Sequence, residues 1–269
     1  MSEADAVDRA SFARTRKSLA ADLRRLGAAE GMTLLVHSSL SSLGWVNGGP
    51  MIVIQALMDV LTTAGTLVMP THTGEYSDPA EWSNPPVPPV WYQAIRDTMP
   101  LFDPRLTPTR GMGRIPELFR TWPGVRRSCH PQVSFAAWGK EAAFVTADHE
   151  LSYSLGEGSP LARLYDLGGY VLLLGVGYDS NTSFHLSECR AGVRPQVCKP
   201  MPVREEGRTI WERIPDIEYD ADPFPAIGAE LDQTGDVTIG QVGSATCRLY
   251  PQVNGVDFAV QWLKARQER

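Results

Sequence analysis

A histidine and a glutamate three positions apart are the residues whose types and spacing could do chemistry. They stand in NTSFHLSE, where His185 precedes Glu188, and this segment follows the apolar run YVLLLGV at 170–176. Residues at i and i+3 of a helix share one face, so Glu188 can hold the imidazole of His185 and stabilise its charged form. A histidine held in this way can remove a proton as a general base. The same spacing also occurs as an ordinary contact on a helix surface.

Polar, glycine-containing loops follow the predicted strands. HSSLSSLGWV at 37–46 contains four serines, PTH closes a strand at 70–72, and LTPTRGMG at 106–113 places an arginine beside glycines. Such loops present backbone N–H groups and hydroxyls to an anion, and arginine binds phosphate groups. Ligands of open α/β sheets bind outside the carboxyl ends of the strands. We therefore expect these loops to surround one site.

Several common catalytic signatures are absent from the sequence. GVGYDS and GMGRIP lack the third glycine of a dinucleotide fingerprint, and there is no P-loop, nucleophile elbow or H-x-x-x-H pair. We therefore expect no metal. A rival to direct transfer stays open, because Cys129 lies beside His130 and Cys189 beside Glu188. A cysteine thiolate in either place would form an acyl-enzyme and give ping-pong kinetics.

The order of apolar runs predicts the elements that must position these residues. Strands are expected at 33–40, 65–72, 133–138 and 170–176, and helices at 9–27, 50–64, 112–121, 256–267 and from Ser159-Pro160 onward. Strand, loop, helix and strand in succession predict a parallel βαβ unit. The expected fold is therefore α/β, with a layered mixed, mostly parallel sheet flanked by helices and long loops that cover the site. We expect one domain over 1–269, with a meandering surface segment at 200–240 whose variable, substrate-facing part is about 200–235.

Charge and composition narrow the class of partner. Lys and Arg number 25 and Asp and Glu 31, so the net charge is −6, which argues against nucleic acid and suits a cationic ligand or an ordinary acidic surface. No run reaches 18 apolar residues, and the first residues contain no apolar signal region, so no membrane partner is expected. The four cysteines form no C-x-x-C pair and are typical of free thiols. The sequence therefore predicts a cytoplasmic protein.

Five ordered motifs carry a family resemblance that covers roughly 30–200 and 238–262. They are VHSSLSSLGWV, GTLVMPTH, FDPRLTPTRGMGRIPELFR, HPQVSFAAWG and LGEGSPLARLYDLGGYVLLLGVGYDSNTSFHLSE. Together they resemble the aminoglycoside N3-acetyltransferase family, which differs in fold from the common GNAT acetyltransferases. The resemblance implies acetyl transfer from acetyl-CoA to the 3-amino group of a 2-deoxystreptamine antibiotic, which confers resistance. It leaves the oligomeric state open.

The resemblance also implies roles for individual residues. His185 matches the catalytic base, and Glu188 matches its partner. The positions similar to the acetyl-CoA contacts are Ser38, Ser39, Ser41, Val46, Pro70, Thr71, Thr109, Arg110, Met112 and Gly113.

A cationic aminoglycoside needs acidic and aromatic walls. The candidates for this role are Glu75, Tyr76, Asp179, Asp216 and Glu218. Two alternatives stay open on the sequence: acylation of another amine metabolite, and a ligand-sequestering protein without catalysis. The spacing of His185 and Glu188 disfavours the second, because sequestration needs no base.

Overall fold

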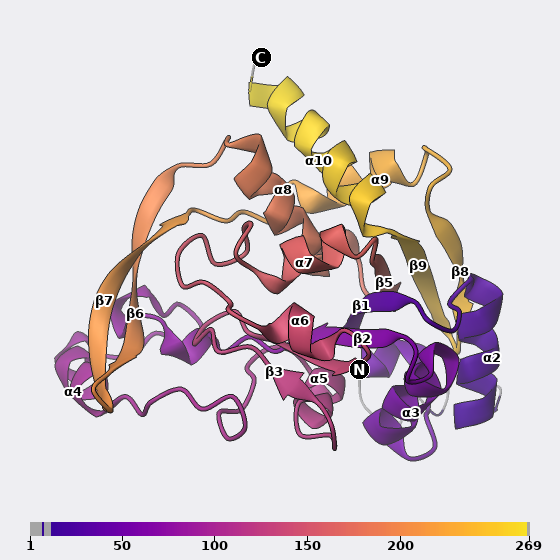
Figure 1. Ribbon diagram of the computed structural model, residues 1–269, viewed down its shortest axis with the longest axis horizontal. Helices are drawn as coiled ribbons and strands as arrows, with labels where there is room; N and C mark the ends of the chain where they lie inside the picture. The colour runs from indigo at the N-terminus through magenta and orange to yellow at the C-terminus, as the bar shows by residue number, and fades with distance from the viewer. Residues whose placement is uncertain (1–6, 8–11, 268–269) are drawn as a thin grey trace.

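A mixed seven-stranded sheet forms the centre of the protein, which the computed structural model describes at residue 7 and residues 12–267. The strand order is β3-β4-β2-β1-β5-β9-β8 (Figure 1). The strands are β1 Thr33–Ser38, β2 Thr66–Pro70, β3 Arg126–Arg127, β4 Phe135–Gly139, β5 Tyr170–Leu174, β8 Thr238–Val242 and β9 Ala245–Pro251. The α/β class and the mixed sheet are thus confirmed.

Parallel pairing is confined to the three central strands of this sheet. β1 pairs parallel with β2 on one side and with β5 on the other, whereas β4, β3, β9 and β8 join antiparallel. At one edge, β8 and β9 are connected by only two residues, and a connection this short enforces antiparallel pairing. The expectation of a mostly parallel sheet therefore holds for the centre and not for the edges.

Helices cover both faces of the sheet (Figure 1). One face carries α2 Arg16–Leu26, α3 Gly49–Leu61 and α5 Arg114–Phe119. The other face carries α6 Ala142–Thr146, α7 Pro160–Asp166, α8 Ser183–Ala191, α9 Phe224–Leu231 and α10 Gln252–Gln267. Burial on both faces explains why the central strands read as unbroken apolar runs.

The segment predicted to meander instead forms a long two-stranded hairpin. β6 Gln196–Glu205 and β7 Arg208–Ile217 pair antiparallel along their whole length. In Figure 1 the hairpin, drawn in orange, arcs away from the seven-stranded sheet toward α4 Tyr92–Thr98. There the indole Nε1 of Trp211 donates to the carbonyl of Arg96 at 3.0 Å. The prediction was wrong because prolines at 200, 202 and 215 argue against a strand, and an isolated hairpin tolerates them at its free edges.

Helix boundaries follow the local capping chemistry. Thr15 caps α2 through a reciprocal capping box with Ser18, and Gly27 ends the helix with φ of 108°. The helix expected over 9–27 therefore begins later, and its positions 9–11 lie outside the described residues. Within the described ranges, no helix is long and apolar enough to cross a membrane.

Candidate active site

The carboxyl ends of β1, β2 and β5 meet at one edge of the sheet. Successive side chains of a strand point to opposite faces. Leu35 of β1 packs with the α7 and α8 side, so His37, two residues on, faces the same side. Val36 packs with the α2 and α3 side, so Ser38 faces that side. The end of β1 thus supplies a polar group to each side of the sheet.

The predicted pair at the start of α8 is formed. His185 Nδ1 lies 2.6 Å from Glu188 Oε2, and the His185 side chain is 17% exposed, whereas that of Glu188 is 0% exposed. Because the carboxylate accepts a hydrogen bond from Nδ1–H, the Nε2 atom is the ring nitrogen left to accept a proton. The ring of His185 packs on the rings of Tyr219 and Phe224, with centroids 5.0 and 4.9 Å away. These contacts fix its plane.

Glu188 has further partners that the sequence did not point to. Arg194 Nε donates to Glu188 Oε1 at 2.5 Å, and the backbone N–H of Asp220 donates to the same oxygen at 3.1 Å. Arg194 lies beyond the end of α8, and Asp220 follows β7, so both reach Glu188 only in the folded chain. No sequence spacing pointed to them.

Two more histidines lie beside this pair. His37 Nε2 is 3.3 Å from the hydroxyl of Thr182, immediately before α8. Burial, and secondarily the nearby His185, lowers the pKa of His37 to about 3. Burial, and after it the nearby His185, are also the largest causes that lower the pKa of His72 to about 3. Both rings are therefore neutral at pH 7 and add no positive charge next to the His185 imidazole.

A pocket of about 530 Å³ lies at the ends of β1 and β5, on the α3 and α5 side. Six residues predicted to bind the coenzyme line it: Ser38, Ser39, Ser41, Val46, Met112 and Gly113. Gly49, the first residue of α3, lines it too, so the positive end of this helix dipole lies at the pocket wall, although the N–H of Gly49 donates to the carbonyl of Val46 at 3.0 Å and Pro50 has no N–H. The Oγ of Ser38 is buried without a hydrogen-bond partner. A phosphate-bearing, polar-chained ligand such as coenzyme A fits these donors.

The other four residues predicted to bind the coenzyme are placed elsewhere. Pro70 and Thr71 are buried, and the Thr71 hydroxyl lies 3.1 Å from that of Ser134. Thr109 donates through its N–H and its hydroxyl to Glu117 Oε2. These three do not line the pocket.

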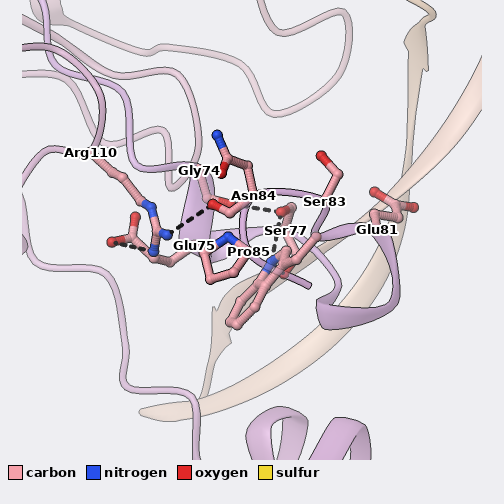
Figure 2. Close-up of a pocket in the computed structure, with 9 residues that line it drawn as sticks. Gly74, Glu75, Ser77, Glu81, Ser83, Asn84, Pro85 and Arg110 are labelled. Carbon is pink, nitrogen blue, oxygen red and sulfur yellow. Dashed lines mark hydrogen bonds and ion pairs between the residues drawn. The ribbon is translucent and has the colours of Figure 1, made fainter. Parts of the chain in front are cut away.

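The fourth, Arg110, lines a separate pocket of about 310 Å³ together with the predicted substrate residue Glu75 (Figure 2). Arg110 Nη1 lies 3.5 Å from Glu75 Oε1, and its Nη2 donates to the carbonyl of Asn84 at 3.3 Å. The second oxygen of Glu75 is buried without a partner. Residues 110–113 therefore form a wall shared by the two pockets, with Arg110 on one side and Met112 and Gly113 on the other.

The remaining predicted substrate residues are dispersed. Tyr76 is buried, with its hydroxyl 3.5 Å from that of Thr107. Asp179 is exposed and stands next to Ser180, which lines the larger pocket. Glu218 is exposed near the base of the hairpin. Asp216 is 1% exposed and accepts from the hydroxyl of Ser154 at 2.8 Å, while Lys199 Nζ lies 3.3 Å away.

The geometry does not support the alternative in which Cys129 or Cys189 forms an acyl-enzyme. Burial raises the pKa of Cys189 to about 11, and its sulfur contacts the hydroxyl of Tyr219 at 3.5 Å. At neutral pH it is a thiol, which is a poor nucleophile. Cys129 is exposed. Among the described residues, no three His, Cys, Asp or Glu side chains are grouped to hold a metal ion.

Comparison with known proteins decides the family. A family model described as aminoglycoside 3-N-acetyltransferase matches residues 35–264. The chain belongs to the aminoglycoside 3-N-acetyltransferase family. Within it, the SPbeta prophage-derived aminoglycoside N(3')-acetyltransferase-like protein YokD of Bacillus subtilis (strain 168) is 48% identical over 258 residues, which is 96% of this chain and 95% of YokD. The crystal structure of YokD matches with a TM-score of 0.97 at 46% identity, covering 99% of both chains.

Solved structures of this family include complexes with coenzyme A and with an aminoglycoside. AAC-IIIb in a binary complex with CoASH matches with a TM-score of 0.84 at 34% identity, covering 95% of this chain and 98% of that one. AAC-VIa bound to sisomicin matches with a TM-score of 0.85 at 30% identity, covering 95% and 99%. Family members thus bind coenzyme A and aminoglycosides.

The buried histidines predict that acid destabilises the fold. Burial lowers the pKa of His37, His72 and His149 to about 3 and that of His130 to about 4. In the unfolded chain histidine titrates near 6.5, so the unfolded state binds more protons below that pH. The stability is therefore full above about pH 6.5 and is lost as the pH falls toward 4, by roughly 1.4 kcal/mol per histidine per pH unit.

Urea unfolding between pH 7.5 and 5.5 measures this effect. The free energy of unfolding should fall steeply over that interval, and His37→Asn, which removes one titrating ring, should reduce the slope by about one proton. A free energy of unfolding that stays constant over this range would contradict the neutral, buried state of these rings.

Proposed function

We propose that the protein is an acetyl-CoA-dependent N-acetyltransferase that modifies the 3-amino group of 2-deoxystreptamine aminoglycosides and so confers resistance to them. The observation that carries the proposal is the buried Glu188 bonded to the partly exposed His185, at the same sheet edge as the hydroxyl-lined pocket. Family membership and the ligands of AAC-IIIb and AAC-VIa support the choice of coenzyme and acceptor.

The larger pocket is the proposed coenzyme site. Gly111 and Gly113 in its wall have φ of 74° and 84°, and a Cβ added to either would project into open space. Their absent side chains keep the pocket open, the hydroxyls of Ser38, Ser39 and Ser41 can donate to the ligand, and the positive end of the α3 dipole favours a pyrophosphate. When bound there, acetyl-CoA supplies the acetyl group as a thioester.

The base acts on the amine of the acceptor. An ammonium group has no lone pair, so the nitrogen must lose a proton to attack the acetyl carbonyl. His185 Nε2 accepts that proton, while the Glu188 carboxylate holds the ring by Nδ1 and stabilises the imidazolium that forms. Backbone N–H groups of the 38–46 loop are the proposed donors to the negative charge that develops on the carbonyl oxygen. When this intermediate collapses, the C–S bond of the thioester breaks, and the coenzyme leaves as a thiolate that gains a proton and is released as CoASH.

The smaller pocket is the proposed acceptor-side surface. Glu75 and Glu81 supply negative charge, and the Trp82 indole is held by the carbonyl and the hydroxyl of Ser77 (Figure 2). Carboxylates attract the ammonium groups of an aminoglycoside, and an aromatic wall suits its sugar faces. The Arg110–Glu75 pair has to open for an ammonium to take the place of the guanidinium.

Release of CoASH from acetyl-CoA with a panel of amines tests the proposal. Sisomicin, a 3-N-acetylated sisomicin and a simple polyamine serve as acceptors, and mass spectrometry of the product locates the acetyl group. We expect turnover with sisomicin, acetylation at the 3-amino group, and no turnover with the 3-N-acetylated compound. Turnover with the polyamine alone would favour another amine as substrate. Binding of sisomicin without CoASH release would favour sequestration.

His185→Ala should abolish the acetylation while it leaves coenzyme binding intact. The loss of a general base costs about 10²–10⁴-fold in kcat, whereas the ring does not line the coenzyme pocket. Glu188→Gln should cost less, since the amide keeps an acceptor for Nδ1. Steady-state kinetics and calorimetric titration with CoASH measure the two effects. Near-parental kcat in His185→Ala would reject the assigned role.

A further inference from the structure

Arg194 is the charged group that completes the surroundings of Glu188. We propose that Arg194 is a positioning residue, which balances the buried carboxylate so that the imidazole of His185 is left unprotonated and ready to act as the base. The kinetic consequence rests on the function proposed above, but the electrostatic consequence is a property of the folded chain alone.

The geometry divides the two oxygens of Glu188 between two tasks. Oε2 accepts a hydrogen bond from His185 Nδ1–H, and Oε1 accepts from Arg194 Nε and from the backbone N–H of Asp220. Each oxygen is therefore fixed in direction, and the carboxylate cannot rotate away from the imidazole without losing two other bonds.

Arg194 is itself held in place by the chain that follows the hairpin. Its Nη2 donates to the carbonyl of Asp220 at 3.1 Å, and its Nη1 lies 3.0 Å from Asp220 Oδ2. Gly192, with φ of 68°, ends α8 and turns the chain so that Arg194 returns to a glutamate of the same helix. The guanidinium thus bridges the end of α8 to the end of β7.

The positive charge of Arg194 affects how tightly the His185–Glu188 pair holds a proton. With Arg194 in place, the charges of Glu188 and Arg194 balance when Glu188 is ionised and His185 is not protonated. The Asp220 carboxylate that also pairs with Arg194 is 37% exposed, so water screens its charge. Without the guanidinium, the buried carboxylate is balanced only when a proton is bound to the pair, on either residue. Loss of the charge should therefore make the His185–Glu188 pair hold a proton more tightly, which removes the base near neutral pH.

The other groups around the pair do not provide a substitute for this charge. His37 from β1 and His72 after β2 are neutral, because burial lowers both their pKa values to about 3. Tyr219 after β7 and Phe224 of α9 pack on the imidazole. Lys199 of β6 lies over the ring of Tyr219, with Nζ 4.4 Å from the centroid, and is paired with Asp216. Within the described residues, Arg194 is the one Lys or Arg in ion-pair contact with Glu188.

Titration of the histidine rings by NMR tests the proposal without any acceptor. The chain has five histidines, so a ¹³C-labelled sample gives few signals, and His185→Asn assigns the one that matters. In Arg194→Gln, which keeps N–H donors but lacks the charge, the midpoint of the His185 titration should move to higher pH by roughly one unit or more. In Arg194→Lys, which keeps the charge, the His185 midpoint should return most of the way to its value in the parental protein. Arg194→Met is a second neutral variant if the glutamine variant folds poorly.

Arg190→Met is the matched control. Arg190 lies on α8, the helix of His185 and Glu188, and forms a bidentate pair with Glu157 at 2.7 and 3.0 Å. It makes no contact with Glu188, so its loss should leave the midpoint unchanged. An unchanged midpoint in the neutral Arg194 variants, or an equal shift in Arg194→Lys, would overturn the proposal.

The pH profile of acetylation supplies the second readout. If the function holds, the acid limb of kcat/KM in Arg194→Gln should move by as much as the NMR midpoint, with activity recovering at high pH. A loss of rate that is equal at every pH would mark a structural role and would also overturn the proposal. If no amine is acetylated by the parental protein, the function fails while the NMR result still decides the role of Arg194.

Discussion

Glu188 is a carboxylate with no solvent exposure, and the site depends on how its charge is held. Burying an ion is costly unless it is paired and hydrogen-bonded. Here the imidazole of His185, the guanidinium of Arg194 and the backbone N–H of Asp220 share the task. These partners come from α8, from the turn after it and from the segment after β7, so the carboxylate finds all three together only in the folded protein.

The sheet brings this cluster to the same edge as the proposed coenzyme pocket. β1 and β5 pair in register from Leu34↔Tyr170 to Ser38↔Leu174, so the loops that follow them start side by side. Because side chains alternate along β1, Ser38 lines the proposed coenzyme pocket, whereas His37 contacts Thr182, immediately before α8. Two neighbouring residues of one strand thus serve the two halves of the proposed reaction. The loop after β5 supplies Val176 and Ser180 to the pocket before it leads into His185.

Local sequence patterns predicted the parts of this arrangement that depend on neighbouring residues. The i, i+3 spacing predicted the contact between His185 and Glu188, and the serine-rich and glycine-rich loops predicted much of the pocket wall. The contacts made at long range left no such signal. Arg194 and Asp220 meet Glu188 through a helix end and a hairpin, and the prolines of that hairpin obscured its strands. The Thr71 side chain is buried, with its hydroxyl beside that of Ser134. Arg110 forms an ion pair with Glu75, which is 35 residues earlier in the sequence.

The position of the acceptor amine relative to His185 is the most direct test of the whole account. A crystal structure with CoASH and sisomicin bound would show it. The account predicts that the 3-amino nitrogen lies about 3 Å from His185 Nε2. It also predicts that the coenzyme sulfur lies next to that nitrogen and that the pyrophosphate lies at the start of α3. A structure in which the bound amine lies beside a cysteine sulfur, or beyond hydrogen-bond reach of this imidazole, would contradict it.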